Sequence, residues 1–255
     1  MLVERGLAPS RSRARSLILA GVVLVDDQRE DKAGTLVHPE AAIRLAKGLQ
    51  PYASRGGVKL EAALEFFGID PRGKAAMDVG ASSGGFTDCL LQKGALRVYA
   101  VDVGYGQLAW KLQRDPRVVN LQRRNIRHLR WEDVGEKVDL AVIDTSFISL
   151  RLVIPPTLSF LKREGEMLAL LKPQFEVGKG QVGKGGVVRD CGQHQKVVEE
   201  IVRFTEDIGL VSQGVMESPL RGPKGNKEFF VYFQCSHGKD RSPQTGKTDR
   251  EPHYV

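Results

Sequence analysis

The sequence predicts an α/β protein in which a mostly parallel sheet is covered by helices on both faces, preceded by a small basic α+β module. Between residues 74 and 235, short apolar runs alternate with helical patterns, as expected for parallel strands joined by helical crossovers. Residues 1–60 carry 10 Lys/Arg against 6 Asp/Glu, whereas residues 61–235 carry 24 against 22. A basic module attached to a near-neutral body indicates that this module binds a polyanion.

Composition excludes several other classes of protein. The chain has 255 residues, enough for one or two domains, and its 41% hydrophobic and 27% charged residues are typical of a globular protein. No apolar run reaches the roughly 18 residues of a membrane-spanning helix, and no signal-peptide pattern begins at Met1. Cys89, Cys191 and Cys235 are far apart and lack metal-ligand spacing. We therefore expect no disulfide framework, no metal site and a cytosolic location.

The N-terminal module is expected over residues 1–47. Residues 10–20 predict a helix with an N-terminal serine cap and an apolar stripe at Ala14, Leu17 and Ile18, followed by a strand at 22–25 and a turn at 26–27. This segment resembles the S4 RNA-binding domain, whose sequence pattern has the same order of SR, A, LI, G and two valines. This resemblance implies phosphate contacts by basic side chains: Arg5, Arg11, Arg13, Arg15 and Arg55. The alternative for the helix arginines is an ordinary solvated face.

The second domain is expected over residues 59–235, after a linker at 48–58 that contains Gly, Pro and Ser. Strands are predicted at 75–79, 98–103, 118–121, 138–143, 166–171 and 229–234, with helices such as 86–93 and 193–207 between them. Residues 236–255 have almost no apolar content and predict a disordered tail.

The first strand of this domain leads into a glycine-rich turn, DVGASSGGFTD at residues 78–88. Its GASSG has the form of a hydrolase nucleophile elbow, but none of the five histidines is suitably placed to serve as the base. A dinucleotide site favours a glycine where Ser82 stands. The third interpretation is S-adenosylmethionine (SAM), which needs a glycine turn and a carboxylate at the end of the next strand. Asp102 supplies that carboxylate, by analogy with dinucleotide folds.

A second glycine-rich stretch, GKGQVGKG at residues 178–185, nearly satisfies the P-loop pattern. Gly185 replaces the hydroxyl residue that would bind magnesium, so a nucleotide triphosphatase is disfavoured. We interpret this stretch as a flexible loop over a polyanionic substrate, with an inert surface loop as the alternative.

Four charged residues lie where a sheet of this kind binds ligands. Asp144 and Lys172 directly follow two apolar strands, and the carboxyl ends of parallel strands line the ligand crevice. Glu228 precedes the last strand, and Lys59 begins the domain. A lysine between apolar residues is often a surface residue that extends its amine to water. A carboxylate on the neighbouring strand favours a functional role instead.

At this point the sequence resembles the TlyA, or hemolysin A, family: ribosomal RNA 2′-O-methyltransferases with an S4 domain joined to an FtsJ-like catalytic domain. The segments that carry the resemblance are SRGGVKL (54–60), DVGASSGGFTD (78–88), DVGYGQLAW (102–110), DTSFISL (144–150), LLKPQFEVGKGQVGKGGVV (170–188) and SPLRGPKGNKEFF (218–230). They imply a Rossmann-like class I SAM-dependent methyltransferase sheet behind the S4 domain. They also imply a Lys-Asp-Lys-Glu catalytic tetrad at Lys59, Asp144, Lys172 and Glu228.

The resemblance implies SAM as cofactor and rRNA or ribosomal subunits as substrate, with a cytidine 2′-hydroxyl as the target. The cofactor-binding residues would be Asp78, Gly80, Ala81, Ser82, Gly84, Gly85, Phe86, Thr87, Asp102 and Val103. In-line transfer from a sulfonium depends mainly on positioning, and we expect Lys172 to steer or deprotonate the ribose hydroxyl. Two alternatives remain: a ribosome-binding or assembly factor with a vestigial SAM site, and a membrane-active hemolysin. We expect no membrane partner and a monomer.

Overall fold

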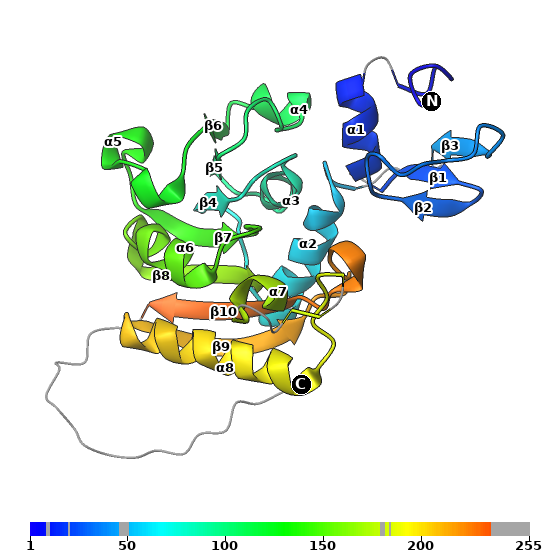
Figure 1. Cartoon of the computed structure of the whole chain (residues 1–255). Coiled ribbons are helices and arrows are strands. Elements are labelled where there is room, and N and C mark those ends of the chain that lie inside the picture. Colours follow the sequence, from blue (N-terminus) through cyan, green and yellow to red (C-terminus); the bar gives the residue numbers. More distant parts are fainter. Residues whose placement is uncertain (9–10, 20, 46–50, 179–181, 184, 236–255) are drawn as a thin grey trace, which may run out of the picture.

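The computed structural model describes residues 1–8, 11–19, 21–45, 51–178, 182–183 and 185–235. The expected helix cap at Ser10, residues 46–50 with the start of the expected linker, and the expected tail at 236–255 lie outside this part. Residues 179–181 and 184 of the second glycine-rich stretch also lie outside it. Figure 1 shows a small N-terminal module beside a larger domain built on one sheet.

The N-terminal module pairs one helix with a three-stranded antiparallel sheet. Helix α1 (Arg11–Leu19) is followed by β1 (Val23–Val25), β2 (Gln28–Glu30) and β3 (Ile43–Leu45), in the sheet order β2-β1-β3. Asp26 and Asp27 have φ values of 48° and 64°, the backbone that a tight two-residue hairpin requires, and Val25 pairs with Gln28 across it. Leu2, Ala8, Ala14 and Val23 form the small core.

The larger domain contains a seven-stranded sheet in the order β6-β5-β4-β7-β8-β10-β9. The strands are β4 (Ala75–Val79), β5 (Arg97–Asp102), β6 (Val118–Gln122), β7 (Val138–Ile143), β8 (Leu161–Leu171), β9 (Leu210–Glu217) and β10 (Phe229–Cys235). The first five along the chain run parallel, and β10 is antiparallel to both β8 and β9. The predicted mostly parallel α/β fold is confirmed, with β9 as a strand that the sequence analysis did not predict.

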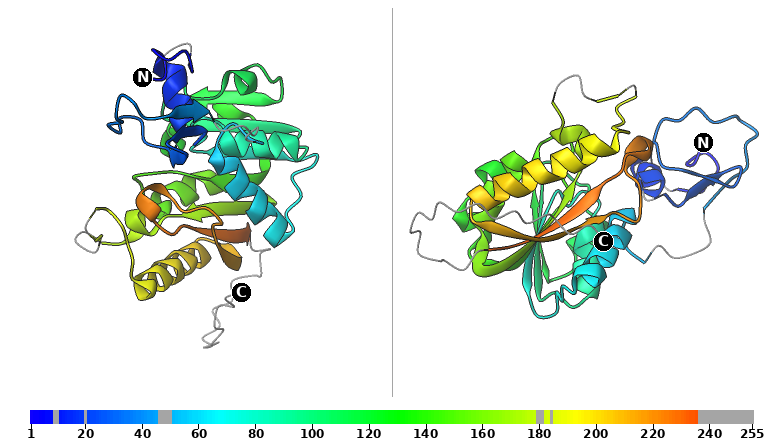
Figure 2. Two further views of the ribbon diagram at one scale, coloured as in Figure 1. Left: turned by 90° about the vertical axis from the view of Figure 1, so that its right-hand side faces the viewer. Right: turned by 90° about the horizontal axis from the view of Figure 1, so that it is seen from below.

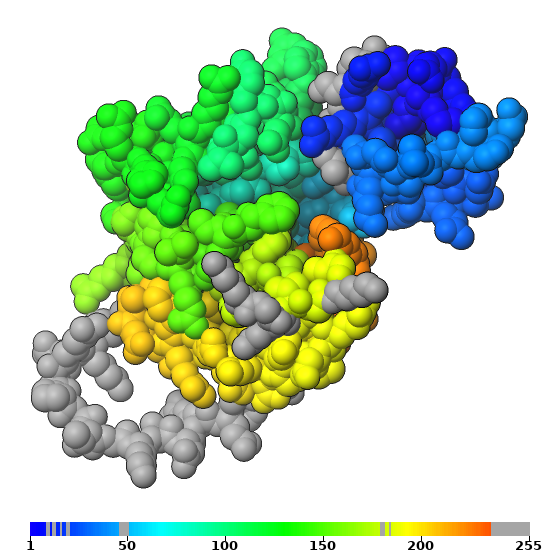
Figure 3. All heavy atoms as spheres, in the orientation of Figure 1, coloured from blue at the N-terminus to red at the C-terminus, as the bar shows by residue number. Residues whose placement is uncertain are grey.

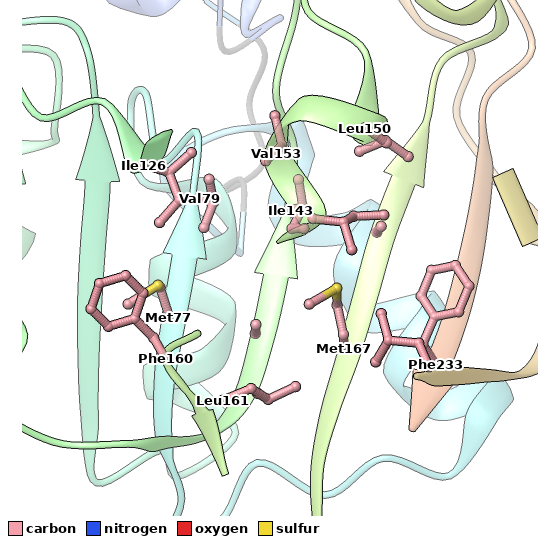
Figure 4. Close-up of a cluster of buried hydrophobic side chains, with 14 of the residues drawn as sticks. Met77, Val79, Ile126, Ile143, Leu150, Val153, Phe160, Leu161, Met167 and Phe233 are labelled. Carbon is pink, nitrogen blue, oxygen red and sulfur yellow. The ribbon is translucent and has the colours of Figure 1, made fainter. Parts of the chain in front are cut away.

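Helices cover both faces of the sheet, as Figure 2 shows in its right-hand view. One face packs against α6 (Leu150–Leu158) and α8 (Cys191–Asp207), and the other against α2 (Arg55–Phe67) and α3 (Gly85–Gln92). Alternate residues of a strand point to opposite faces, so Met77 and Ala76 enter different cores. Figure 4 shows the first core, in which Met77, Ile143 and Met167 interdigitate from neighbouring strands.

Helix α2 begins inside the segment that the sequence predicts as a linker. Ser54 caps the helix by accepting a hydrogen bond from the Gly56 amide at 3.3 Å, so the helix starts at Arg55. Gly57 is required by close packing, because a Cβ atom there would lie 2.3 Å from the Tyr52 side chain. Gly56 and Gly57, which suggested a linker, therefore lie in the first turn of the helix where neighbouring side chains pack closely against it. Within the described ranges, five short helical segments connect the remaining elements: α4 (Trp110–Gln113), η1 (Ile126–His128), α5 (Trp131–Val134), α7 (Pro173–Glu176) and η2 (Pro223–Gly225).

Candidate active site

A cleft of about 340 Å³ opens at the carboxyl edge of the sheet. It is bordered by the turn after β4, the segments after β7 and β8, the residue before β10 and the start of α2. Because β10 runs antiparallel to β8, the residue that precedes β10 lies at the same edge as the residue that follows β8, with Phe229 paired to Leu171. This topology brings Glu228 and Lys172 to one cleft from segments far apart in the sequence.

The four predicted tetrad residues all line this cleft and form two ion pairs. The Lys172 ammonium lies 2.6 Å from a carboxylate oxygen of Asp144, and the Lys59 ammonium lies 2.6 Å from Glu228. The Glu228 side chain is fully buried, and the Lys59 and Lys172 side chains are only 11% and 9% exposed. Burying a charged group costs free energy unless the group is paired with an opposite charge. The two ion pairs are therefore part of the cleft and differ from ordinary ion pairs on the protein surface.

Lys172 has a further partner that sequence reasoning missed. Its ammonium also donates to the Ser146 hydroxyl at 2.9 Å. A lysine ammonium has three N–H donors, so Asp144 and Ser146 leave one of them for a molecule in the cleft. The signal was present in the sequence, since Ser146 lies two residues after Asp144 in the DTSFISL segment.

The segment after Asp144 is held in place by Glu176, a second missed residue. The Ser149 hydroxyl and the Leu150 amide donate to its two carboxylate oxygens at 2.6 and 2.7 Å. Burial raises the pKa of Glu176, and these two hydrogen bonds oppose that rise. At the exposed tip of the segment, Phe147 has a φ of 64° and a side chain 90% exposed, with its ring 5.1 Å from that of Phe175.

The turn after β4 has a backbone that only glycine allows at two positions. Gly80 and Gly84 have φ values of 91° and 89°. A Cβ atom at Gly80 would lie 2.5 Å from the Asp144 carbonyl oxygen, and one at Gly84 would lie 2.3 Å from the Leu112 side chain. The turn therefore approaches the tetrad closely, and five of the predicted cofactor residues line the cleft: Gly80, Ala81, Ser82, Gly85 and Phe86.

The other predicted cofactor residues lie beneath or beside the turn and do not line the cleft. Thr87 is buried and donates to a carboxylate oxygen of Asp78 at 2.6 Å. Asp102 accepts the Ser82 amide at 2.8 Å and the Gly104 amide at 2.6 Å, one on each oxygen. Val103 is 70% exposed just past the end of β5.

Three carboxylates lie at the ends of adjacent strands at this edge of the sheet. Asp78, Asp102 and Asp144 belong to the ends of β4 and β5 and to the residue after β7. Burial raises the pKa of Asp78 to about 7, and the charges of Asp144 and Asp102 contribute to the rise. One oxygen of Asp78 is buried without a hydrogen-bond partner in the described structure. A buried acceptor beside like charges suits a cationic ligand group, such as the ammonium and sulfonium of SAM.

The predicted RNA-contacting arginines have different environments. Arg11 and Arg15 are exposed on α1, and the Arg13 side chain lies outside the described atoms. Arg5 instead donates to the backbone carbonyls of Ala41 and Pro39, so its guanidinium holds the N-terminus onto the module. Arg55 forms an ion pair with Asp31 at 2.9 Å.

The N-terminal module borders the cleft directly, which the sequence analysis did not anticipate. Asp31 and Lys32 line it together with Arg55 and Pro223. Figure 3 shows the blue N-terminal module next to the orange turn that precedes β10. The module is therefore placed to contact whatever occupies the cleft.

Comparison with known proteins agrees with this architecture. Residues 52–235 match the FtsJ-like methyltransferase family, and residues 1–43 match the S4 domain. The chain is 48% identical to the 16S/23S rRNA (cytidine-2′-O)-methyltransferase TlyA of Mycobacterium tuberculosis (strain CDC 1551 / Oshkosh), over 91% of this chain and 87% of the relative. It is 37% identical to Hemolysin A of Brachyspira hyodysenteriae, over 90% of this chain and 96% of the relative.

A solved structure from Streptococcus thermophilus, described only as a candidate hemolysin, superposes with a TM-score of 0.74 at 39% sequence identity. The superposition covers 92% of this chain and 86% of the other. Matches in sequence and in structure thus both extend over the N-terminal module and the catalytic sheet. The chain belongs to the FtsJ-like methyltransferase family and carries an S4 domain at its N-terminus.

Proposed function

We propose that this protein transfers a methyl group from SAM to the 2′-hydroxyl of a cytidine in ribosomal RNA. The observation that carries the proposal is the position of Lys172, which lies in one cleft with the glycine turn and has two of its three N–H donors occupied by Asp144 and Ser146. The relative from Mycobacterium tuberculosis is named for this reaction. Bound SAM supplies an electrophilic methyl group.

In this mechanism the chain mainly orients the reactants. The glycine turn holds the cofactor, the strand-end carboxylates beneath and beside the turn favour its positive charge, and Lys172 directs its free N–H to the ribose oxygen so that the oxygen faces the methyl carbon. Asp144 and Ser146 fix the Lys172 ammonium, whereas Glu228 fixes Lys59 on the other wall of the cleft. The hydroxyl proton leaves toward water as the O–CH3 bond forms and the S–CH3 bond breaks, because the Lys172 ammonium already carries three protons. The exposed ring of Phe147 offers a surface on which a base could stack.

The first test is transfer of labelled methyl from SAM to unmodified ribosomal subunits and to naked ribosomal RNA. We expect label in RNA on at least one of these substrates. SAM binding without any transfer would favour the alternative of an assembly factor with a vestigial cofactor site. The tetrad argues against that alternative, since a binding protein does not need two buried ion pairs beside the cofactor turn.

Membrane activity is the second alternative, because two relatives carry hemolysin names. No helix in the described part of the chain is both long and apolar enough to cross a bilayer. Dye release from liposomes at protein concentrations that support methyl transfer tests this alternative. The cytosolic location, the monomeric state and the boundaries of the predicted linker and tail stay predictions.

A proton is expected to leave Asp78 when SAM binds. The pKa of this buried carboxyl is raised to about 7, and a nearby cation favours the ionised form. Near pH 7 we therefore expect about half a proton to be released per SAM, and SAM affinity to rise between about pH 6 and 7.5. Calorimetry in buffers of different ionisation enthalpy measures this release. Asp78→Asn should abolish it and weaken SAM binding; unchanged proton release in this variant would contradict the assignment.

The same shift predicts how stability changes with pH in the absence of SAM. Because the pKa of Asp78 is higher in the folded chain than the ordinary value of 3.8, the neutral carboxyl favours folding at low pH. That contribution is lost as the pH rises from about 4 to about 7. The Asp78→Asn variant should therefore show a smaller loss of stability over this range than the wild type, as measured by urea unfolding.

A further inference from the structure

The segment 111–130 carries a large share of the chain's positive charge. It contains seven Lys/Arg and one Asp/Glu, against a net charge of +7 for the whole chain. Four of these cations are paired with carboxylates: Lys111 with Asp88, Arg117 with Asp115, and Arg124 and Arg130 both with Asp133. Among the described residues, Arg114, Arg123 and Arg127 have no carboxylate partner. Their guanidinium groups are therefore available to an external anion.

Arg114 and Arg123 are each stacked on an exposed aromatic ring. The Arg114 guanidinium carbon lies 4.5 Å from the centre of the Trp110 ring, and that of Arg123 lies 4.1 Å from the centre of the Tyr105 ring. Trp110 and Tyr105 are 69% and 65% exposed. A guanidinium fixed on an aromatic face is pre-organised, while its N–H groups stay free for phosphate oxygens. We call these four residues the aromatic–arginine face.

The backbone beneath this face is tied down by hydrogen bonds. The Gly106 amide donates to the Gln122 side chain at 2.9 Å, and the Arg123 amide donates to the Gly104 carbonyl at 2.9 Å. The Ala109 amide donates to the Ser83 carbonyl at 3.1 Å, which joins the start of α4 to the glycine turn. The exposed rings are thus held at fixed positions beside the site, and they are not on a free loop.

The face also lies on the side of the molecule that carries the S4 helix. Figure 1 draws α4 and α1 in the same upper part of the molecule. Arg11 and Arg15 are exposed on α1. Rings and guanidinium groups side by side fit a single-stranded nucleic acid, because each base offers a flat surface and each nucleotide a phosphate.

We propose that the aromatic–arginine face, formed by Tyr105, Trp110, Arg114 and Arg123, binds the single-stranded RNA that flanks the target nucleotide. This proposal rests on the proposed function, since it concerns the substrate of the same cleft. The catalytic domain then contributes its own RNA-binding surface next to the S4 domain. Bases stack on the exposed rings, and the guanidinium groups contact phosphates.

The test compares Trp110→Ala and Arg114→Ala with two matched controls elsewhere on the catalytic domain. Trp131→Ala removes a ring that is 47% exposed and lies under the Lys137 ammonium, and Arg203→Ala removes an exposed cation of α8. Methyl transfer to naked ribosomal RNA is measured as KM and kcat, and SAM affinity is measured by calorimetry. We expect KM for RNA to rise about tenfold in Trp110→Ala and Arg114→Ala. We expect kcat and SAM affinity to stay within about twofold.

Direct binding of a short single-stranded RNA of mixed sequence, at several salt concentrations, separates the two kinds of contact. Arg114→Ala should weaken binding and lower the slope of log K against log salt by about 0.7, the value for one phosphate contact on a single strand. Trp110→Ala should weaken binding without changing that slope. This measurement requires no methyl transfer, so it tests the aromatic–arginine face even if the wild type methylates no RNA. A wild type that methylates no RNA would contradict the proposed function and not this proposal.

Three results would overturn the proposal. The first is unchanged RNA binding and KM in both variants, which would leave a protein partner as the occupant of the face. The second is a loss of SAM affinity with RNA binding preserved, which would assign the rings to the cofactor. The third is an equal loss of RNA binding in Trp131→Ala, which would show that any exposed tryptophan contributes. Thermal unfolding of each variant confirms that the chain is folded.

Discussion

Lys172→Ala is expected to lower the rate of methyl transfer by about 10³-fold or more, because the ribose oxygen loses the ammonium group that orients it toward the methyl carbon and stabilises the negative charge that develops on it. SAM affinity should change by less than about threefold, since Lys172 has no hydrogen bond to the glycine turn in the described structure. Single-turnover transfer at saturating SAM and RNA measures the first effect, and calorimetry the second.

Lys172→Arg is the matched control for charge at this position. A guanidinium keeps the positive charge, but its planar fork cannot reproduce the contacts of the ammonium with both Asp144 and Ser146. We expect this variant to be nearly as inactive as Lys172→Ala. Activity close to wild type in Lys172→Arg would show that charge alone is needed, and parallel loss of SAM binding in Lys172→Ala would point to a folding defect.

Lys59→Met is expected to destabilise the fold by about 3 to 5 kcal/mol, because it leaves the Glu228 carboxylate buried without its partner. The Glu228 side chain is fully buried, and its second oxygen already has no hydrogen-bond partner in the described structure. Space beside it is also tight, since a Cβ atom at Gly222 would lie 1.9 Å from that oxygen. Urea unfolding of the variant at neutral pH measures the loss.

The double variant Lys59→Met/Glu228→Gln separates structure from catalysis. Removing both charges should restore most of the stability, as replacement of a whole buried ion pair commonly does. Methyl transfer should stay low, because the pair forms one wall of the cleft. Full stability in Lys59→Met alone would refute the view that Glu228 depends on Lys59, and full activity in the stable double variant would remove both residues from the proposed mechanism.

Much of the catalytic fold could be predicted because its strands are buried on both faces. Runs such as 138–143 and 166–171 are apolar at nearly every position, which marks a central parallel strand. Strand β9 could not be found this way, since it lies at the edge of the sheet and most of its residues are partly exposed. The start of helix α2 was not predicted, because Gly56 and Gly57 are typical of a linker. Only the structure shows that Gly57 packs against Tyr52.

The site could be predicted only in part. Asp144 and Lys172 follow from strand ends, whereas Glu228 depends on the antiparallel direction of β10, which the sequence does not show. The roles of Lys59 and Glu228 came from family resemblance alone. The contribution of Asp31 and Lys32 to the cleft depends on how the two domains pack, and no local pattern encodes it.

The basic segment at 111–130 was missed for a different reason. Averaging charge over residues 61–235 gives a near-neutral domain, because acidic residues elsewhere cancel the excess. A count over windows of about twenty residues would have revealed it. Arg5 illustrates the opposite error. It was predicted to contact RNA because it lies in a basic module, but its guanidinium group donates hydrogen bonds to backbone carbonyls.

The most direct test of the central claim is the position of the methyl group in the RNA product. Labelled RNA from the wild-type reaction is hydrolysed with alkali, which cleaves only where the 2′-hydroxyl is free. We predict that the label is found in alkali-resistant dinucleotides that begin with a methylated cytidine, and that it is absent when Lys172→Ala replaces the wild type. Label on a base in alkali-sensitive mononucleotides, or label that persists in Lys172→Ala, would contradict ribose methylation by this cleft.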